Sequence, residues 1–170
     1  MVVIAIIGLS MSTIFAGSRS LLPQSRLRAA ATGLSADLEL VRSHAQLTQE
    51  PIVLAYDLDD HGYEAWFPYE RDERGQNIGV GRTPVLERRE LPESVVFKVL
   101  RLASSEPRTS ETIELTVSPL GRISPHEIVL MNPDHPETEL LTLRVNGLVN
   151  RALLLSGDMI QVPLQDVDFR

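Results

Sequence analysis

The distribution of apolar and polar positions divides the chain into three parts, the first of which is apolar throughout. Residues 1–18 contain no charged side chain. A helix without a polar stripe is typical of a segment buried on all sides, as in a membrane. The segment extends to residue 22 if Arg19 snorkels toward lipid headgroups. The sequence therefore predicts a hydrophobic transmembrane or filament-core helix over residues 1–22, with these packing residues: Val2, Val3, Ile4, Ile6, Ile7, Leu9, Ile14 and Phe15.

The second part, residues 23–50, has helical periodicity on one side only. Its apolar positions recur every three or four residues, which predicts an amphipathic helix that packs on a domain. The positions in this stripe are Leu27, Ala31, Leu34, Leu38, Val41 and Ala45. Pro23 produces a kink or a fresh start after the first helix. Together the two helices form a long rod that ends at Glu50 and Pro51.

The third part, residues 51–170, shows the short alternating segments and turn residues of β-strands. Expected strands are 52–56, 63–67, 85–91, 95–102, 112–117, 127–131, 140–145 and 148–155. The Asn146-Gly147 pair is the strongest hairpin signal, and residues 71–83 have no periodicity, which favours a polar loop. The predicted fold is α+β: a long, partly transmembrane N-terminal helix, then an antiparallel sheet or sandwich of about seven strands.

Composition and charge exclude several classes of function. The 170 residues include 16 basic and 23 acidic side chains, a net charge of −7, and no cysteine. Phosphate backbones require a basic surface, so nucleic acid is not an expected partner. Thiol catalysis, disulfides and thiolate zinc sites are excluded by the missing cysteines. A hydrophobic share of 43% is enough for a folded core.

No motif predicts catalysis, a cofactor or a metal. Asp57, Asp59 and Gly62 resemble the first half of a calcium loop, but Pro68 stands where a bidentate glutamate is needed, so an acidic hairpin turn is the favoured interpretation. Nucleophile-elbow, phosphate-loop and dinucleotide-binding patterns are absent from the sequence. The four histidines lack metal-ligand spacing and are expected to be solvated or to cap helices: His44, His61, His126 and His135.

Three segments carry a resemblance to a known family. The opening MVVIAIIGL resembles the N-terminal helix of type IV pilins and type II secretion pseudopilins, entered just after its Glu-Leu pair. Leu38–Leu54 resembles the minor pseudopilins of the H class, in which this helix runs into a Pro-Val strand. Val117–Arg122 and Val145–Val149 resemble the two glycine turns of that class. The chain is thus similar to an H-class minor pseudopilin over most of its length.

This resemblance implies a structural role rather than an enzymatic one. It implies a subunit of a type II secretion pseudopilus that assembles with other pseudopilin or pilin subunits through its apolar helix. It also implies a single-pass inner-membrane protein with residues 51–170 in the periplasm. A type IV pilus or competence minor pilin, and a membrane-anchored envelope binding module without a filament role, are the alternatives.

The resemblance further implies processing at the N-terminus. The family's peptidase site and its glutamate have no counterpart in this sequence. Three explanations are open: a start assigned too late, a truncated fragment, or a degenerate relative. A prepilin peptidase is an expected partner only if a basic leader exists upstream. Such a basic leader would also favour a periplasmic location of residues 51–170, because basic residues before a membrane helix tend to stay in the cytoplasm. Arg19, Arg26 and Arg28 all follow the apolar run, which by itself would favour a cytoplasmic C-terminal part.

Overall fold

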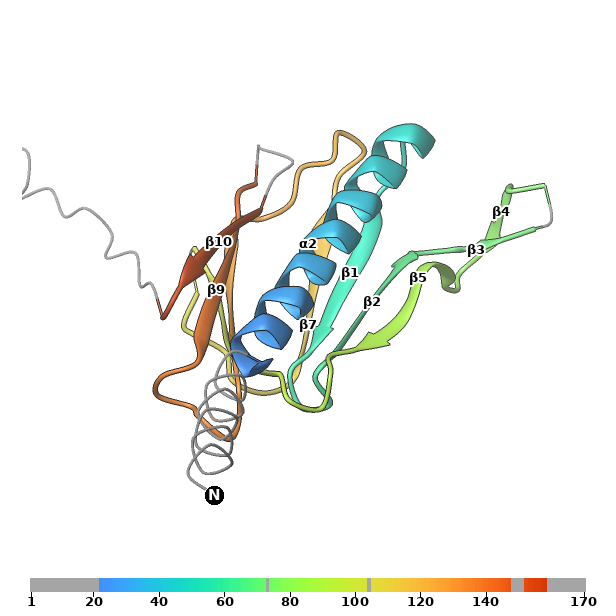
Figure 1. Cartoon of the computed structure of the whole chain (residues 1–170). Coiled ribbons are helices and arrows are strands. Elements are labelled where there is room, and N and C mark those ends of the chain that lie inside the picture. Colours follow the sequence, from blue (N-terminus) through green and yellow to red (C-terminus); the bar gives the residue numbers. More distant parts are fainter. Residues whose placement is uncertain (1–21, 73, 104, 148–151, 159–170) are drawn as a thin grey trace, which may run out of the picture.

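One helix followed by ten strands makes up the part of the chain that the structure describes. The structure is a computed structural model, and it describes residues 22–72, 74–103, 105–147 and 152–158. Helix α2 spans Leu22–Thr48 (Figure 1). The strands are β1 (Ile52–Asp57), β2 (Gly62–Phe67), β3 (Glu70–Arg71), β4 (Asn77–Gly79), β5 (Thr83–Glu90), β6 (Val96–Leu102), β7 (Thr112–Val117), β8 (His126–Met131), β9 (Leu140–Val145) and β10 (Ala152–Ser156).

The strands form two four-stranded sheets and one small hairpin. The first sheet has the order β5-β2-β1-β7, the second β10-β9-β8-β6, and β3 pairs only with β4. All pairings between these strands are antiparallel. Figure 1 shows α2 lying across both larger sheets, while the β3–β4 hairpin projects away from the body. The prediction of a helix followed by antiparallel sheets is confirmed.

The main core lies where α2 meets the two sheets. The six apolar residues of the stripe on α2 have exposed fractions of 0–4%. They join buried side chains from both sheets, including Tyr56 and Leu54 of β1 and Leu143 of β9, in one hydrophobic cluster. Each large aliphatic side chain buried in this way contributes about 1.5–3 kcal/mol. The helix is therefore fixed along its length against the β domain.

The helix ends with a left-handed residue. Gln49 has a φ of 58°, and the Glu50 amide donates to the Ala45 carbonyl at 3.3 Å. A left-handed residue after the last turn is a usual way to satisfy the final helical carbonyls. Thr48, the last helical residue, lies two positions before the predicted end.

The loop predicted over residues 71–83 is partly wrong, because β3, β4 and the start of β5 lie in this region. The Asp72 carboxylate accepts the amides of Arg74 and Gln76 at 2.9 and 2.8 Å, and Gly75 has a φ of 78°. These contacts close a tight turn. All three residues of β4 are exposed, so no alternation of burial marks this strand in the sequence.

The hairpin predicted at Asn146-Gly147 is confirmed, because β9 and β10 pair antiparallel, but its second strand begins later than predicted. Val145 pairs with Ala152, so residues 146–151 connect β9 to β10. A Cβ on Gly147 would lie 2.5 Å from the Ile123 carbonyl oxygen, so the backbone here packs against the β7–β8 connection. Glycine is required for this close approach and not for a type I′ turn.

Leu22, the last residue of the predicted membrane helix, begins α2, but residues 1–21 of that helix lie outside the described residues. The same holds for the packing positions assigned to it, which are Val2, Val3, Ile4, Ile6, Ile7, Leu9, Ile14 and Phe15. Among the helices of the described part, none is long and apolar enough to cross a membrane.

Candidate functional site

The most unusual surface of the described part is the side of α2 that faces away from both sheets. We call it the outer stripe, and its members, all exposed, are Ala29, Gly33, Ala36, Leu40, Ser43 and Leu47. These positions repeat the spacing of the buried stripe two residues later, which is about 200° around the helix. Figure 1 views α2 from this uncovered side.

The composition of the outer stripe differs from that of an ordinary solvated face. Leu40 and Leu47 are 52% and 84% exposed, and the other members are small and uncharged. A Cβ on Gly33 would meet nothing within 4 Å. A surface helix normally presents charged and polar residues to water. Small residues next to exposed leucines instead allow another helix or domain to approach closely.

A buried carboxylate ties α2 to the first sheet. Asp37 is 8% exposed; one of its oxygens accepts the Tyr63 hydroxyl at 2.8 Å, and both accept Arg89 Nη1 at 2.8 Å. Burial, and then the neighbouring Asp37 carboxylate, raise the pKa of Tyr63 well above its usual range. The tyrosine therefore stays protonated and donates its hydrogen bond at all ordinary pH values. These three residues link α2, β2 and β5.

Two further polar contacts tie α2 to the loops beyond the sheets. Arg42 is 3% exposed, and its Nη2 donates to the Asn146 carbonyl at 2.7 Å. Burial lowers the pKa of Arg42 from its ordinary value. Gln46 Nε2 donates to the Leu120 carbonyl at 3.0 Å, directly beside Gly121, whose φ is 72°. Together with Asp37, these contacts prevent α2 from rotating, so the outer stripe keeps its direction.

Asp37 and Arg42 are not members of the apolar stripe, yet both are buried. Each lies three or four residues from a buried leucine, Leu34 or Leu38, and therefore at the margin of the packed face. That spacing is the signal that could have identified them. Charged residues are rarely buried without partners, so their partners had to come from the β domain.

His126 contradicts the expectation that all four histidines are solvated or capping. It is 2% exposed, its Nε2 lies 3.1 Å from the Tyr56 hydroxyl, and its Nδ1 lies 2.7 Å from the Ser124 carbonyl oxygen. The pair joins β1 of the first sheet to β8 of the second. Burial lowers the pKa of His126 to about 4, so the ring is neutral at pH 7.

The acidic β1–β2 turn uses its carboxylates within the protein. Asp57 Oδ1 accepts the amides of Asp59 and Asp60 at 3.2 and 3.1 Å, and Oδ2 accepts Arg88 Nη2 at 2.9 Å. The backbone hydrogen bond from Asp60 is the main cause that lowers the pKa of Asp57. Within the described ranges, no group of three or more histidine, aspartate or glutamate side chains could hold a metal ion. The contacts match the acidic hairpin turn.

Comparison with known proteins gives matches only at the level of structure. No known family model matches the sequence, and no curated protein matches it either. Two solved structures of the minor pseudopilin EpsH from the type II secretion system of Vibrio cholerae match with TM-scores of 0.53 and 0.55 at 14% identity. They cover 77% and 78% of this chain, and in each case 97% of the EpsH chain is matched.

A third match is the solution structure of E. coli GspH. It has a TM-score of 0.54 and 20% identity, and the match covers 78% of this chain and 89% of GspH. At these identities the likeness shows the fold. The chain described here therefore has the pilin-like fold of the minor pseudopilin EpsH, which GspH shares, as the resemblance in its sequence implied.

Proposed function

We propose that this chain is a minor pseudopilin, a structural subunit of a type II secretion pseudopilus that supports protein export across the outer membrane. The observation that carries the proposal is the fold match to EpsH and GspH, which extends over 89–97% of those chains. The chain acts by assembling with other pilin-like subunits and catalyses no reaction.

The proposed arrangement assigns one role to each part of the chain. Residues 1–22 anchor the subunit in the inner membrane and pack in the filament core. Residues 23–50 continue the rod, and residues 51–170 form the periplasmic β domain. The uncharged stretch over residues 1–18 supports the anchor, because only a segment without exposed charge is stable in hydrocarbon. A prepilin peptidase is a partner if a leader precedes Met1.

The outer stripe of α2 is the proposed contact with neighbouring subunits. It is available because the opposite side of the helix is occupied by the β domain, and its orientation is fixed by Asp37, Arg42 and Gln46. Leu40 and Leu47 supply apolar area, and Gly33 allows close approach. Burying an exposed leucine in an interface is favourable by about 25 cal/mol per Å² of apolar surface removed from water.

Gene deletion in the bacterium that carries the chain tests the proposed function. Loss of the gene should reduce the amount of exported protein in the medium, and the wild-type gene should restore it. The double variant Leu40→Glu/Leu47→Glu should fold but fail to restore export, because charges in the outer stripe oppose subunit packing.

The control is Ile78→Glu on the β3–β4 hairpin, since Ile78 is also well exposed, at 60%. It should restore export like the wild type. Normal export after deletion would contradict the proposal. If deletion abolished twitching or DNA uptake instead, the pilus alternative would be favoured.

A further inference from the structure

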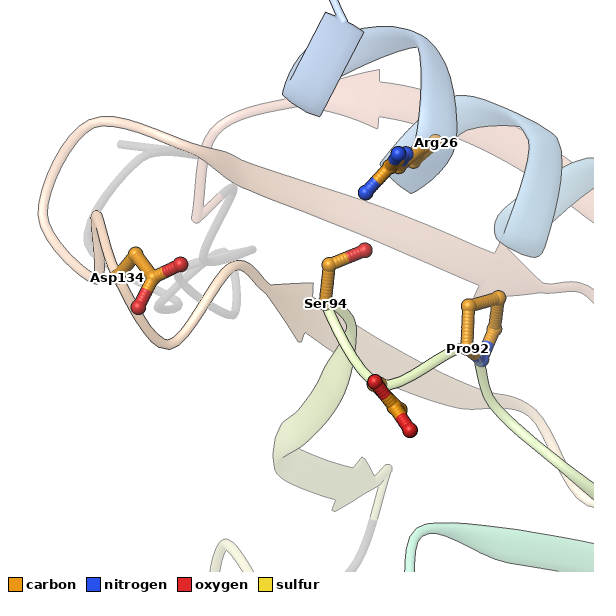
Figure 2. A pocket seen from close by; sticks show the side chains of 5 residues that line it. Arg26, Pro92, Ser94 and Asp134 are labelled. Carbon is orange, nitrogen blue, oxygen red and sulfur yellow. The ribbon is translucent and has the colours of Figure 1, made fainter.

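An open cleft of the described part lies at the end of the molecule where α2 begins. It has a volume of about 480 Å³ and is lined by Arg26, Pro92, Glu93, Ser94 and Asp134. Figure 2 shows Arg26 extending from α2 toward Ser94, with Asp134 on the loop across the cleft. The cleft therefore brings together the first turns of the helix, the β5–β6 loop and the β8–β9 loop.

Hydrogen bonds hold both loops in place around the cleft. The Val95 amide donates to the Pro92 carbonyl at 2.7 Å, which closes the β5–β6 turn. In the β8–β9 loop, buried Asn132 donates from Nδ2 to Glu139 at 2.7 Å, and its Oδ1 accepts the Asp134 amide at 3.1 Å. The walls of the cleft are thus defined before any ligand binds.

The charged side chains that line the cleft have no hydrogen-bond or ion-pair partner within the described part of the protein. In the described ranges, the side chains of Arg26, Glu93 and Asp134 make no hydrogen bond or ion pair, unlike the paired arginines Arg88, Arg89 and Arg144. One guanidinium and two carboxylates thus line the same open cleft. A ligand that carries a phosphate beside an ammonium group would complement this arrangement.

We propose that this cleft binds the headgroup of a phosphoethanolamine lipid at the membrane surface. Arg26 contacts the phosphate, while Glu93 and Asp134 accept hydrogen bonds from the ammonium group. A choline headgroup has no N–H to donate and is usually bound by aromatic cages, but none of the lining residues is aromatic. The inference rests on the proposed function, because it requires the apolar N-terminal segment to lie in a membrane.

The position of Arg26 along the chain agrees with this location. It follows Leu22, the last residue of the proposed anchor and the first of α2, by four residues. Four residues advance about 6 Å along a helix axis, and the headgroup layer is about 5–8 Å thick on each side. Long side chains on a helix also lean toward its N-terminus, which brings the Arg26 guanidinium closer to that layer. The cleft opens at the level where headgroups would lie.

The test uses the full chain reconstituted in vesicles of phosphatidylcholine with an equal amount of phosphatidylethanolamine. After gentle detergent extraction, native mass spectrometry counts the molecules of each lipid that remain bound. Ion pairs in an open site are weak, so we expect retained phosphatidylethanolamine to exceed phosphatidylcholine by about two- to fivefold. Arg26→Ala should reduce the retention of both lipids, because both carry the phosphate.

The double variant Glu93→Gln/Asp134→Asn should remove the preference for phosphatidylethanolamine and leave phosphatidylcholine unchanged. Matched controls are Arg28→Ala, an exposed arginine two residues away, and Glu137→Gln in the same loop as Asp134. Neither lines the cleft, so both should retain lipid like the wild type. All of these side chains are exposed, and circular dichroism verifies that each variant is folded.

Three results would overturn the inference. Equal retention of the two lipids, or a preference that survives the double variant, would show that the carboxylates do not select the ammonium group. If soluble phosphoethanolamine were retained in the same amount as phosphatidylethanolamine, the cleft would bind a soluble ligand and not a lipid. If carbonate removed the chain from the vesicles, membrane anchoring itself would be refuted. If the chain inserted normally but showed no lipid preference, only the headgroup site would be refuted.

Discussion

Asp37 shows how one buried carboxylate determines the attachment of the helix. It is the shared acceptor of the Tyr63 hydroxyl and the Arg89 guanidinium. Replacing Asp37 with alanine leaves the tyrosine donor buried without a partner. We expect Asp37→Ala to lower the free energy of unfolding by about 1–3 kcal/mol, measured by urea denaturation.

The control for this variant is Glu39→Ala, an exposed acidic residue on the same helix. Exposed substitutions of this kind change stability by about 0.5 kcal/mol or less. Equal losses for the two variants would show that the buried hydrogen bonds of Asp37 contribute nothing specific.

His126 should make stability depend on pH. Its pKa in the folded protein is about 4, below the ordinary 6.5, so the unfolded chain binds a proton more readily. The stabilisation is therefore complete above about pH 6.5 and is lost as the pH falls toward 4, by about 3 kcal/mol in total. Urea denaturation at a series of pH values measures this loss.

His126→Gln serves as the comparison, because glutamine does not titrate. The variant should be less stable at pH 7, since the hydrogen bond to Tyr56 is altered. Its stability should vary less between pH 6.5 and 4 than that of the wild type. An unchanged pH profile would mean that carboxylates, not His126, dominate the acid sensitivity.

At the scale of the element, Gly33 lowers the stability of α2, whereas its missing side chain favours the proposed close approach of a neighbouring subunit. A Cβ there meets no atom within 4 Å, so alanine reduces the entropy of the unfolded chain without strain. Gly33→Ala should raise the free energy of unfolding by about 0.5–1 kcal/mol. Thermal denaturation followed by circular dichroism measures this change.

Gly121→Ala provides the contrast. Gly121 has a φ of 72°, and a Cβ would lie 2.6 Å from Gln46 Nε2. We expect this variant to lose stability by about 1 kcal/mol or more. A stabilising Gly121→Ala would show that the contact between α2 and the β7–β8 turn is not tight.

The elements that the sequence predicts correctly are those with a repeating pattern of apolar residues that reach the core. The stripe of α2 is visible because a helix buried on one side repeats every three to four residues. In β9, Leu141, Leu143 and Val145 face the helix-side core and mark the strand in the same way. β3 and β4 lack this mark because they bury almost nothing.

The polar parts of the candidate site were harder to predict. The partners of Asp37 and Arg42 are 26 or more residues away in the chain, so no local spacing reveals them. The Asn146-Gly147 signal predicts the β9–β10 hairpin correctly but not where its second strand begins, because Gly147 also packs closely against the Ile123 carbonyl. Tertiary packing decides such positions, and sequence patterns record only their local preferences.

At the scale of the whole molecule, stability should be distributed unevenly. The β3–β4 hairpin is attached at its base, where Arg71 forms an ion pair with Glu50 and lies 3.8 Å above the Phe67 ring. Beyond that base, Ile78 and Val80 are exposed. The amides of Asn77–Gly79 should exchange with deuterium far faster than those of β1 and β8, which lie inside the sheets.

Hydrogen exchange followed by mass spectrometry measures this difference. Exchange of the hairpin as slow as that of β8 would contradict it, and would indicate that the hairpin is protected by a partner. The comparison is direct because both segments are read in the same sample.

The direction of α2 relative to the sheets has a mechanical consequence. Contacts between the buried stripe and the β domain extend from Leu27 to Ala45, about 27 Å at the helical rise. A force applied to the N-terminal end along the helix axis loads all of these contacts in shear, at the same time. Peeling, by contrast, would break them one after another. A subunit pulled through its N-terminal segment should therefore unfold slowly under load, because forced unfolding is governed by the barrier and not by the equilibrium stability.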